Sequence, residues 1–433
     1  MSRLEELIAE LCPNGVEYKT LGEIGIFIRG SGLQKKDFTE SGVGCIHYGQ
    51  IYTFYGSFAY KTKSFVAKEL AKNLKKVNHG DLIFAITSEN IEDVCKCLAW
   101  LGEEEIVIGG HSAIFKHNQN PKYITYYTQT ENFFRQKRKI VTGTKVIEAS
   151  PAKLSLIKIP VPPLPVQEEI VRILDNFAEL TAELAAELAK RKQQYQYYRD
   201  CLLTFDKRGV TSQTDRQTAV NSILWKKYNY DVNYIKLSEL FEFKNGLNKG
   251  KEFFGRGDYI VKYMDVYKHP ALTKENLTDR VEVTNNEKEK LSARKGDVFF
   301  TRTSETREEI GFASVLLEEV EGCVFSGFLI RARQKTKKLL PKYCAYCFKS
   351  KGVREQIIKN CIFTTRASLS GSNLGLVKIP VPPLAEQARI VSILDRFDAL
   401  CNDLTSGLPA EIEARKKQYE YYRDKLLTFK EAV

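Results

Sequence analysis

The sequence contains few of the features that mark membrane proteins or secreted proteins. No apolar run approaches the roughly 20 residues that a membrane span needs. The first 15 residues, "MSRLEELIAELCPNG", include three Glu and no long apolar stretch, which argues against a secretory signal peptide. We therefore expect a cytoplasmic protein whose ten cysteines are reduced thiols.

Motifs of cofactor binding and catalysis are absent as well. The sequence has no P-loop, no G-x-G-x-x-G and no Asn-Pro-Pro-aromatic tetrapeptide of the kind that amino-methyltransferases use. The five His have no ligand-like spacing. Cys344 and Cys347 have C-x-x-C spacing, but the matching positions of an internal repeat hold Ile124 and Tyr127. We interpret both cysteines as buried apolar side chains, so the sequence nominates no metal ligand and no catalytic residue.

Charge and hydrophobic content indicate a globular protein with an anionic partner. The chain has 433 residues, of which 43% are hydrophobic, and this length suits two or three domains with proper cores. Lys and Arg number 66 against 54 Asp and Glu, a formal net charge of +12. An excess of this size favours a polyanion such as nucleic acid, although many soluble proteins are basic.

A long internal repeat organises the chain. "IKIPVPPLPVQEEIVRILDNF" begins at Ile157, and "VKIPVPPLAEQARIVSILDRF" begins at Val377, 220 residues later. "RKQQYQYYRDCLLTF" begins at Arg191 and "RKKQYEYYRDKLLTF" at Arg415, 224 residues later. The second copy has therefore gained four residues, which is close to one helical turn.

Weaker similarities extend the repeat upstream. "HGDLIFAITSEN" at His79 resembles "KGDVFFTRTSET" at Lys295, and "IGGHSAIFK" resembles "FSGFLIRAR", which places His111 opposite Phe328. Each half therefore consists of one variable region and one nearly invariant region. The stretch "DKRGVTSQTDRQTAVNS" (Asp206–Ser222) is polar and lacks apolar periodicity, so we expect a linker between the halves, at residues 207–232.

The invariant regions predict long amphipathic helices. Proline disfavours helix, so "IPVPPL" should be an extended connector, followed by a helix of about 58 Å from Val166 to Thr204. Apolar residues then recur at alternating spacings of three and four, the pattern of a coiled-coil seam. In the first copy the seam residues are Ile170, Ile173, Phe177, Leu180, Leu184, Leu188, Tyr195, Tyr198 and Leu202. In the second copy they are Ile390, Ile393, Phe397, Leu400, Leu404, Leu408, Ile412, Tyr419, Tyr422 and Leu426.

Two such helices in one chain can bury each other's apolar stripe. Packing on a partner protein, or both arrangements at once, are the alternatives. Gly407 and Pro409 should break or kink the second helix. "AEL" recurs at Ala178, Ala182 and Ala186. This repeat either is simply good helix composition or marks a spacer helix whose length can change by whole turns.

The basic charge lies outside the predicted helices. Residues 165–206 hold five basic and eight acidic side chains, and residues 385–431 hold eight and nine. The rest of the chain therefore carries a net charge of +16. This distribution assigns polyanion binding to the variable regions and an architectural role to the helices.

These features together resemble a known family, the DNA-specificity subunits of type I restriction–modification enzymes. The residues that carry the resemblance are "CPNGVEYKTLGEI" at Cys12, the paired "KIPVPPL" segments, "TAELAAELAKRKQQYQYYRD" and "TSGLPAEIEARKKQYEYYRD". The resemblance implies an α+β fold with a pseudo-two-fold internal repeat. Two mixed α/β target recognition domains would be separated by a long antiparallel helical coiled-coil pair.

The resemblance also implies domain boundaries. Residues 1–156 would form an N-terminal helix and the first target recognition domain, and residues 157–206 the first spacer helix. After the linker, residues 233–376 would form the second target recognition domain, and residues 377–433 the second spacer helix.

A role within a larger complex follows from the resemblance. Each domain would recognise one half of a bipartite site in double-stranded DNA, and the helices would set the gap between the halves. Two methyltransferase subunits would dock on the helices, and two motor–nuclease subunits would join them. The chain itself would be non-catalytic and hold no cofactor, because S-adenosylmethionine, ATP and Mg²⁺ would be bound by the partners.

Candidate DNA-contacting residues are polar or basic side chains in predicted loops. We prefer Arg302 and Arg366 as readers of guanine, because one guanidinium can bond both O6 and N7; the alternative for each cation is a phosphate contact or a solvated charge. In the first domain the candidates are Arg29, Ser31, Lys35, His47, Tyr48, Gln50, Ser88, His111, Thr144 and Lys145. In the second they are Asn245, Lys249, Lys262, Tyr263, Arg302, Thr303, Arg307, Thr364, Thr365 and Arg366.

Two other functions compete with this interpretation. A self-contained DNA methyltransferase or nuclease would transfer methyl groups or cut DNA without a partner, and the missing tetrapeptide argues against the methyltransferase. A non-catalytic protein scaffold would leave no bipartite footprint on DNA, and the basic excess of the variable regions argues against it.

Overall fold

The computed structural model describes residues 2–205, 232–403 and 405–432. The chain divides into two compact units. Unit 1 combines Met1–Ala185 with Glu411–Val433, and unit 2 consists of Ala186–Ala410. Each unit therefore contains one variable domain, the start of the helix that follows it, and the end of the helix from the other copy. Of the predicted linker, only Val232 lies among the described residues.

From α2 onward, the described helices occur at equivalent places in the two copies. In the first half they are α1 (Arg3–Leu11), α2 (Leu21–Ile24), α3 (Tyr48–Thr53), α4 (Lys68–Ala71), α5 (Pro121–Tyr127), α6 (Glu131–Ile140), α7 (Pro151–Leu154) and α8 (Leu164–Leu202). In the second half they are α10 (Leu237–Leu240), α11 (Tyr263–Lys268), α12 (Asn285–Lys290), α13 (Pro341–Cys347), α14 (Lys351–Lys359), α15 (Gly371–Gly375), α16 (Leu384–Asn402) and α17 (Leu408–Leu426).

Each variable domain is built on a five-stranded sheet of the same order. In unit 1 the order is β2 (Gly25–Arg29), β12 (Ser112–His117), β8 (Leu82–Ala85), β10 (Lys96–Trp100) and β5 (Phe58–Ala59). In unit 2 it is β16 (Phe241–Asn245), β24 (Leu329–Gln334), β20 (Val298–Thr301), β22 (Ala313–Leu316) and β18 (Ala271–Leu272). The pairs are antiparallel except the last in each sheet, which is parallel. Helices and sheets occur together in both domains, which confirms the predicted mixed α/β character.

The remaining strands form smaller sheets around this framework. Unit 1 has a second five-stranded sheet of β3 (Phe38–Thr39), β6 (Ser64–Val66), β4 (Val43–Ile46), β11 (Ile106–Ile108) and β7 (Lys75–Val77). Unit 2 has a three-stranded one of β19 (Arg280–Val281), β17 (Phe254–Val261) and β23 (Val324–Phe325). The short pairs are β1 (Tyr18–Thr20) with β14 (Lys158–Pro160), and β15 (Asn233–Lys236) with β27 (Lys378–Val381).

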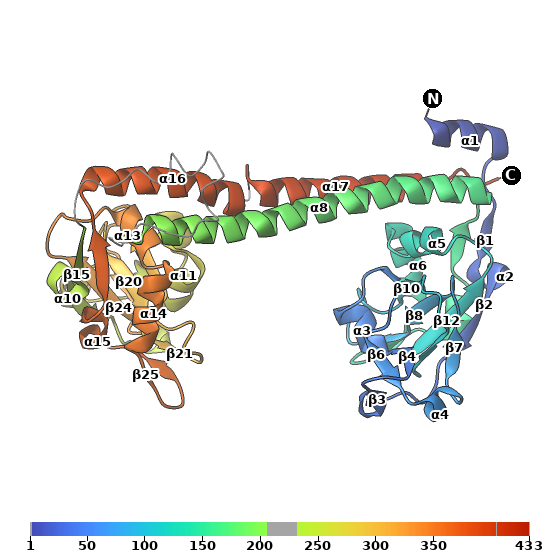
Figure 1. Cartoon of the computed structure of the whole chain (residues 1–433), viewed down its shortest axis with the longest axis horizontal. Helices are drawn as coiled ribbons and strands as arrows, with labels where there is room; N and C mark the ends of the chain where they lie inside the picture. Colours follow the sequence, from blue (N-terminus) through green and yellow to red (C-terminus); the bar gives the residue numbers. More distant parts are fainter. Residues whose placement is uncertain (1, 206–231, 404, 433) are drawn as a thin grey trace, which may run out of the picture. The chain divides into compact units, whose positions relative to one another are not determined.

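A short helix lies between the sheet and the long helix in each unit. In unit 1, α5 packs on β10 and also contacts α8, and in unit 2, α13 packs on β22 and α16 (Figure 1). Lys122 and Tyr126 of α5 both bind Asp175 of α8, at 2.6 and 2.5 Å. Burial and this carboxylate raise the pKa of Tyr126, so its hydroxyl remains a donor. Unit 2 repeats the arrangement around Asp395 of α16.

The long helices match the sequence prediction closely. The first, α8, begins two residues before the predicted start and has 39 residues. In the second copy α16 ends at Asn402 and α17 begins at Leu408, so the break predicted at Gly407 and Pro409 is confirmed. A side chain at position 407 would place its Cβ 2.5 Å from the carbonyl oxygen of Ala399, which is why the break contains glycine.

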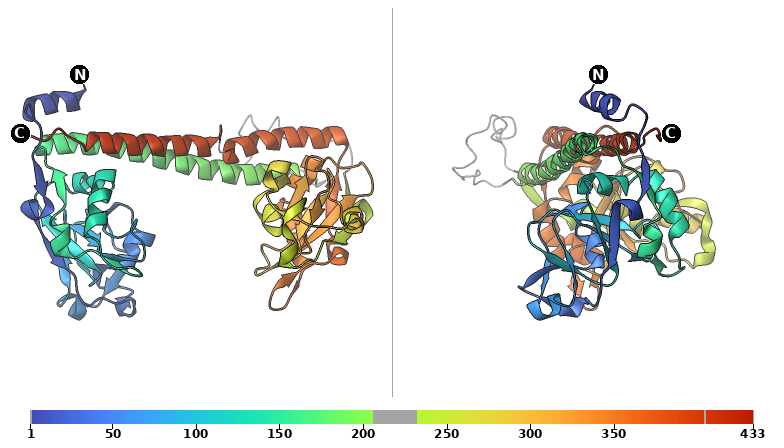
Figure 2. Two further views of the ribbon diagram at one scale, coloured as in Figure 1. Left: turned by 180° about the vertical axis from the view of Figure 1, so that it is seen from behind. Right: turned by 90° about the vertical axis from the view of Figure 1, so that its right-hand side faces the viewer.

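The seam between the helices is formed by the same aromatic pair in both units. In unit 1, Phe177 of α8 stacks on Tyr422 of α17 with ring centroids 5.6 Å apart. In unit 2, Phe397 of α16 and Tyr198 of α8 lie 5.5 Å apart. Each pair joins the first part of one helix to the last part of the other. Figure 1 and Figure 2 both show α17 beside the first part of α8, which confirms the antiparallel helical pair.

The seam prediction is wrong at two positions. Leu180 and Leu400 were expected to be buried between the helices, but 52% and 39% of their surface is exposed. Conversely, Val166, Val171 and Leu174 lie outside the predicted seam and are buried in the core of unit 1. These three residues are buried because the first turns of α8 pack on their own domain as well as on α17, which widens the apolar face there. Leu404 lies outside the described residues.

Each unit also receives a helix cap from the other copy of the repeat. The Asp424 carboxylate at the end of α17 accepts a hydrogen bond from the Glu131 backbone N–H at the start of α6, at 3.1 Å. In unit 2, the Asp200 carboxylate of α8 accepts from the Lys351 N–H at the start of α14, at 2.9 Å. A carboxylate at a helix N-terminus satisfies a free donor and is favoured by the helix dipole.

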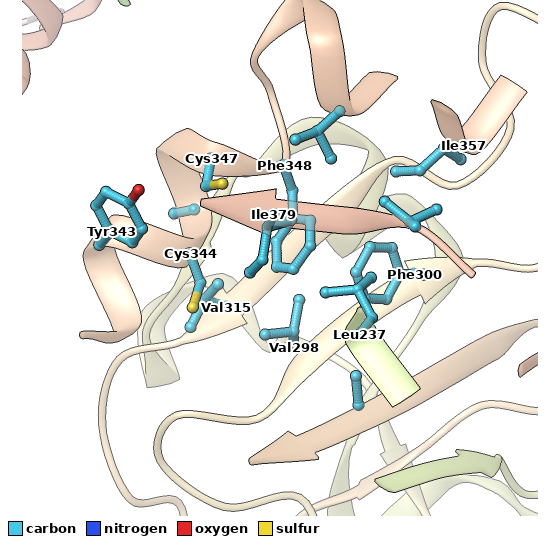
Figure 3. Close-up of a cluster of buried hydrophobic side chains, with 14 of the residues drawn as sticks. Leu237, Val298, Phe300, Val315, Tyr343, Cys344, Cys347, Phe348, Ile357 and Ile379 are labelled. Carbon is cyan, nitrogen blue, oxygen red and sulfur yellow. The ribbon is translucent and has the colours of Figure 1, made fainter. Parts of the chain in front are cut away.

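The cysteine pair of the C-x-x-C spacing lies in the apolar core of unit 2. Cys344 and Cys347 of α13 are fully buried and pack with Phe348, Val315 and their neighbours (Figure 3). Burial raises the pKa of Cys344 to about 12, which keeps the thiol protonated. Among the described residues, no cluster of three or more His, Cys, Asp or Glu is arranged to hold a metal ion. The interpretation as buried thiols is therefore confirmed.

A buried cation fixes one loop of the first domain. The loop of residues 89–95 separates β9 (Thr87–Ser88) from β10. Lys137 of α6 donates to the carbonyl oxygens of Glu92 and Val94, both at 3.0 Å. Burial lowers the pKa of Lys137. The loop ends at Cys95 in a left-handed conformation with φ 64°, which a non-glycine residue seldom adopts.

Unit 2 builds the equivalent loop, residues 305–311, with a different cation. Arg354 of α14 donates to the carbonyl oxygens of Glu308, Ile310 and Gly311 at 2.9, 2.7 and 2.8 Å. Gly311 has the same φ of 64° as Cys95. The two domains therefore keep the same loop geometry although the cation and the left-handed residue differ.

Among the described residues, no helix is both long and apolar enough to cross a membrane.

We expect Asp200→Ala to destabilise the first turn of α14 more than Asp424→Ala destabilises the first turn of α6. The N-cap residue Ser350 makes no side-chain cap bond, whereas Thr130 of α6 still accepts from Phe133 N–H after the carboxylate is lost. Loss of a cap costs about 0.5–2 kcal/mol, and the larger value should apply to α14. Amide hydrogen exchange of the first turn of each helix measures the difference; equal loss of protection would contradict it.

Replacing Arg354 by Met should lower the free energy of unfolding by about 3 kcal/mol, because three carbonyl groups lose a charged donor. Urea unfolding of the full chain measures this change. Lys351→Met on the same helix is the control, since its side chain is 76% exposed and should matter by less than about 0.5 kcal/mol. Similar losses for both variants would show that the three bonds do not stabilise the loop.

Candidate nucleic-acid interface

A hairpin stands beside the sheet in each variable domain. In unit 1, β9 pairs with β13 (Ile147–Glu148), which follows the hairpin turn of residues 142–146. In unit 2, β21 (Thr303–Ser304) pairs with β26 (Ala367–Ser368), which in turn pairs with β25 (Ile362–Phe363). We call the surface around each hairpin the hairpin face. It comprises residues 29–35, 47–52, 86–90, 110–112 and 142–148 in unit 1, and residues 245–251, 262–267, 302–306, 326–328 and 362–369 in unit 2.

The backbone of the unit 1 hairpin face is held by two bonds at one residue. The N–H of Ile86 donates to the carbonyl oxygen of His111 at 3.0 Å, and the Ile86 carbonyl accepts from Ala149 N–H at 2.9 Å. These bonds join the end of β8, the turn before β12 and the end of the hairpin. The side chain of Ile86 is fully buried below them.

Unit 2 repeats both bonds with different residues. The N–H of Arg302 donates to the Phe328 carbonyl, and the Arg302 carbonyl accepts from Leu369 N–H, each at 2.9 Å. The two domains thus hold different side chains at equivalent backbone positions: Phe328 replaces His111, and the partly buried Arg302 replaces the fully buried Ile86. The sequence alignment that placed His111 opposite Phe328 agrees with this framework.

Aromatic side chains gather on the unit 1 hairpin face. The ring of Tyr48 at the start of α3 lies 4.8 Å from that of His111, whose Nδ1 lies 3.2 Å from the Thr87 hydroxyl. His47 is the N-cap of α3, and its Nδ1 accepts from Gly49 N–H at 3.2 Å. Burial and then the charge of Lys35 lower the pKa of His47, so the ring that accepts this bond is neutral.

Polar side chains surround these rings. Arg29 at the end of β2 forms a 2.7 Å ion pair with Glu148 of the hairpin, and both side chains are about half exposed. Gln50 donates to the Ser64 hydroxyl at 2.7 Å. Lys35 and the hairpin residues Thr144 and Lys145 are exposed, so their groups are free to meet a ligand.

The unit 2 hairpin face contains a pocket of about 350 Å³. The pocket is lined by Tyr263, Met264, Tyr267, Thr303, Ser304, Glu305, Glu309 and Arg366. The rings of Tyr263 and Tyr267 stack 6.0 Å apart on α11, and the Tyr267 hydroxyl donates to Glu309 at 2.8 Å. This bond raises the pKa of Tyr267, which keeps the hydroxyl protonated.

The cations of this face differ in how firmly they are held. Arg366 lies 3.9 Å from Glu305 with both side chains largely exposed, and the exposed Arg307 lies over the ring of Phe363 at 4.8 Å. Lys249 is only 13% exposed and binds Glu287 at 2.8 Å. Lys262 binds Asp279 at 2.6 Å. Arg307 and Arg366 are therefore better placed to contact a ligand than Lys249.

Most of the candidates are brought together on the two hairpin faces. Thr364, Thr365 and Arg366 are exposed on the hairpin of unit 2, close in sequence to its turn, and Asn245 is exposed where β16 ends. Ser31 and Thr303 are partly buried beside their hairpins.

The loop placement is wrong for several candidates, which lie in helices or strands: Tyr48 and Gln50 in α3, Tyr263 in α11, Ser88 in β9, Thr303 in β21, and Arg29 and Asn245 at the ends of β2 and β16. Two candidates are also buried. His47 and Ser88 are each only 8% exposed, the first as a helix cap and the second inside β9. Both belong to backbone-capping arrangements, because the Ser88 hydroxyl accepts from Asn90 N–H at 3.4 Å. They support the neighbouring loops and offer little surface of their own.

Sequence reasoning missed the apolar part of the unit 2 face. Phe328 is 65% exposed, Met264 49% and Ile362 58%. A search for polar and basic residues cannot find them. The only signal was the alignment of Phe328 with His111. Cations, hydroxyls, carboxylates and exposed apolar groups together suit contacts with phosphates and base edges.

Comparison with known proteins places this geometry in a family. The model of the type I restriction modification DNA specificity domain matches residues 13–191 and again 229–414. The EcoR124I/EcoR124II specificity subunit of Escherichia coli is 34% identical over 295 residues, which cover 63% of each chain. A putative type I restriction enzyme specificity subunit of Haemophilus influenzae is 30% identical over 341 residues, or 76% of each chain.

Solved structures share the fold. A chain from a structure described as the structural basis of complex assembly and conformational transition of the type I R-M system has a TM-score of 0.63 at 18% identity, covering 96% of this chain and 98% of its own. The HsdS subunit of Thermoanaerobacter tengcongensis has a TM-score of 0.50 at 16% identity, with coverage of 96% and 97%. Two matched copies of the domain account for most of the sequence, and this chain belongs to the type I restriction modification DNA specificity family.

Proposed function

We propose that this chain is the non-catalytic DNA-binding subunit of a type I restriction–modification complex. Each variable domain recognises one half of a bipartite site in double-stranded DNA. One observation carries the proposal: the two hairpin faces have the same backbone framework but different side chains. Equivalent positions hold Ile86 and Arg302, and His111 and Phe328. Two such surfaces suit two half-sites of different sequence.

The charge distribution supports DNA as the ligand. The long helices are slightly acidic, and the remainder of the chain carries the whole basic excess. Phosphate contacts supply most of the affinity of DNA-binding proteins, and cations beside polar and apolar side chains add sequence readout. Arg302 and Arg366 remain our preferred guanine contacts, because the Arg302 backbone joins the hairpin to the turn that holds Phe328, and Arg366 is exposed on the hairpin.

The partners follow from the same proposal. Two methyltransferase subunits would dock on the helical pair and bind S-adenosylmethionine, and two motor–nuclease subunits with ATP and Mg²⁺ would complete the complex. The exposed Leu180 and Leu400 support a docking role for the helices, since leucines of the predicted seam are left uncovered on them. The helices would also set the gap between the half-sites. The complex would act in the cytoplasm.

Exchanging residues 21–156 for the equivalent domain of a relative should change one half of the recognised site. The framework bonds lie within the exchanged segment, so the rest of the chain should fold as before. Methylated adenines mapped in a host genome that encodes the complex would give both half-sites before and after the exchange. Altered sequence in both halves would contradict independent recognition.

Deleting residues 181–184, "TAEL", should shorten the gap by one or two base pairs and leave both half-sites intact. The deletion removes about 6 Å of α8, against about 3.4 Å per base pair. Replacing the same four residues by alanines preserves the length and is the control, for which the gap should stay unchanged. A changed gap in the alanine variant, or an unchanged gap after deletion, would refute the proposal that the length of α8 sets the gap between the half-sites.

A further inference from the structure

Phe328 is an exposed aromatic residue of the unit 2 hairpin face. It lies in the turn between β23 and β24, and 65% of its surface is open to solvent. Phe328, Met264 and Ile362 together form the exposed apolar part of this face, and exposed apolar groups gathered on one surface can mark an interaction site.

The backbone around Phe328 is fixed. The N–H of the preceding Gly327 donates to the Leu247 carbonyl at 2.7 Å, and Leu329 N–H donates to Ser326 at 3.0 Å across the turn. The Phe328 carbonyl itself accepts the bond from Arg302. The turn is thus held on both sides, and the framework directs the ring outward.

The backbone of Phe328 adjoins residues that the proposed function assigns to DNA. Arg302 is bonded through its backbone to Phe328 on one side and on the other to Leu369, where the hairpin with Thr364 and Arg366 ends. The exposed Phe328 is therefore one backbone bond away from Arg302, and a ligand bound there is within its neighbourhood.

Unit 1 offers a natural comparison at the same backbone position. His111 has the equivalent bond to Ile86, but its ring is engaged by Tyr48 at 4.8 Å and by the Thr87 hydroxyl at 3.2 Å. Histidine there can exchange hydrogen bonds, whereas the ring of Phe328 has no polar atom. The two domains therefore differ in the chemistry that they present at one equivalent point.

We propose that Phe328 contacts the C5 methyl group of a thymine in the half-site bound by unit 2. This inference rests on the proposed function. The thymine methyl is the apolar group that a base pair displays in the major groove, and a phenylalanine ring can select it by apolar contact. A specificity-determining residue of this kind distinguishes thymine from cytosine without any hydrogen bond.

The test replaces each thymine of this half-site, on both strands, by uracil, which lacks only the methyl group. The assembled complex of the full chain is titrated with these duplexes after the site has been mapped by methylation. Uracil at one position should weaken binding by about fourfold, the effect of one buried methyl group. Phe328→Ala should weaken binding to the thymine duplex to a similar extent and abolish the uracil effect at that position.

Leu376→Ala is the matched control, because Leu376 is an apolar residue of unit 2 that is 54% exposed but lies outside the hairpin face, so it should leave the uracil effect unchanged. Specific binding with no uracil effect above twofold at any thymine, or a uracil effect that persists in Phe328→Ala, would overturn the inference. A half-site without thymine would overturn it as well. Failure of the proposed function gives a different result, namely no specific binding to a bipartite site.

Discussion

The structure depends on the exchange of helix ends between the two copies of the repeat. Each unit has a core made from one variable domain, the first turns of its own long helix and the last turns of the other helix. In unit 1 the exchange is seen in the stacking of Phe177 on Tyr422 and in the cap that Asp424 gives to α6. Because the same contacts recur in unit 2, neither half of the sequence contains all of its own core.

This arrangement separates two roles within each domain. The side facing the long helix is conserved between the copies, as the bonds from α5 to Asp175 and from α13 to Asp395 show. The hairpin face keeps the backbone bonds and exchanges the side chains. The stability of a domain and the chemistry that it presents to a ligand therefore lie on different surfaces, and one can change with little effect on the other.

The sequence predicted the parts of the fold that local rules control. Proline marked the start of α5, α13 and the long helices, and Gly407 marked the break between α16 and α17. The prediction that Leu180 is buried was wrong. The spacing of apolar residues along a helix shows that one face is apolar, but it does not show which part of that face the neighbouring domain or helix will cover.

The candidate site was predicted as a region more than as a set of residues. His47 was a candidate because it is a polar residue in a predicted loop, but in the structure it is the N-cap of α3. Phe328 was passed over, because exposure of an apolar residue depends on backbone bonds between segments far apart in the sequence.

The two turns that end the loops after β9 and β21 have a consequence for how these domains diverge. Both turns place a residue at φ 64°, glycine in one domain and cysteine in the other. In each case a cation of the neighbouring helix donates hydrogen bonds to the carbonyl groups of the loop. This cation is Lys137 in one domain and Arg354, at a different helical position, in the other. The two copies therefore keep carbonyl acceptors at equivalent positions, Glu92 and Val94 in one and Glu308 and Ile310 in the other, although the amino acids that bind them differ. Such domains will superimpose in space long after pairwise residue matching ceases to detect their common origin.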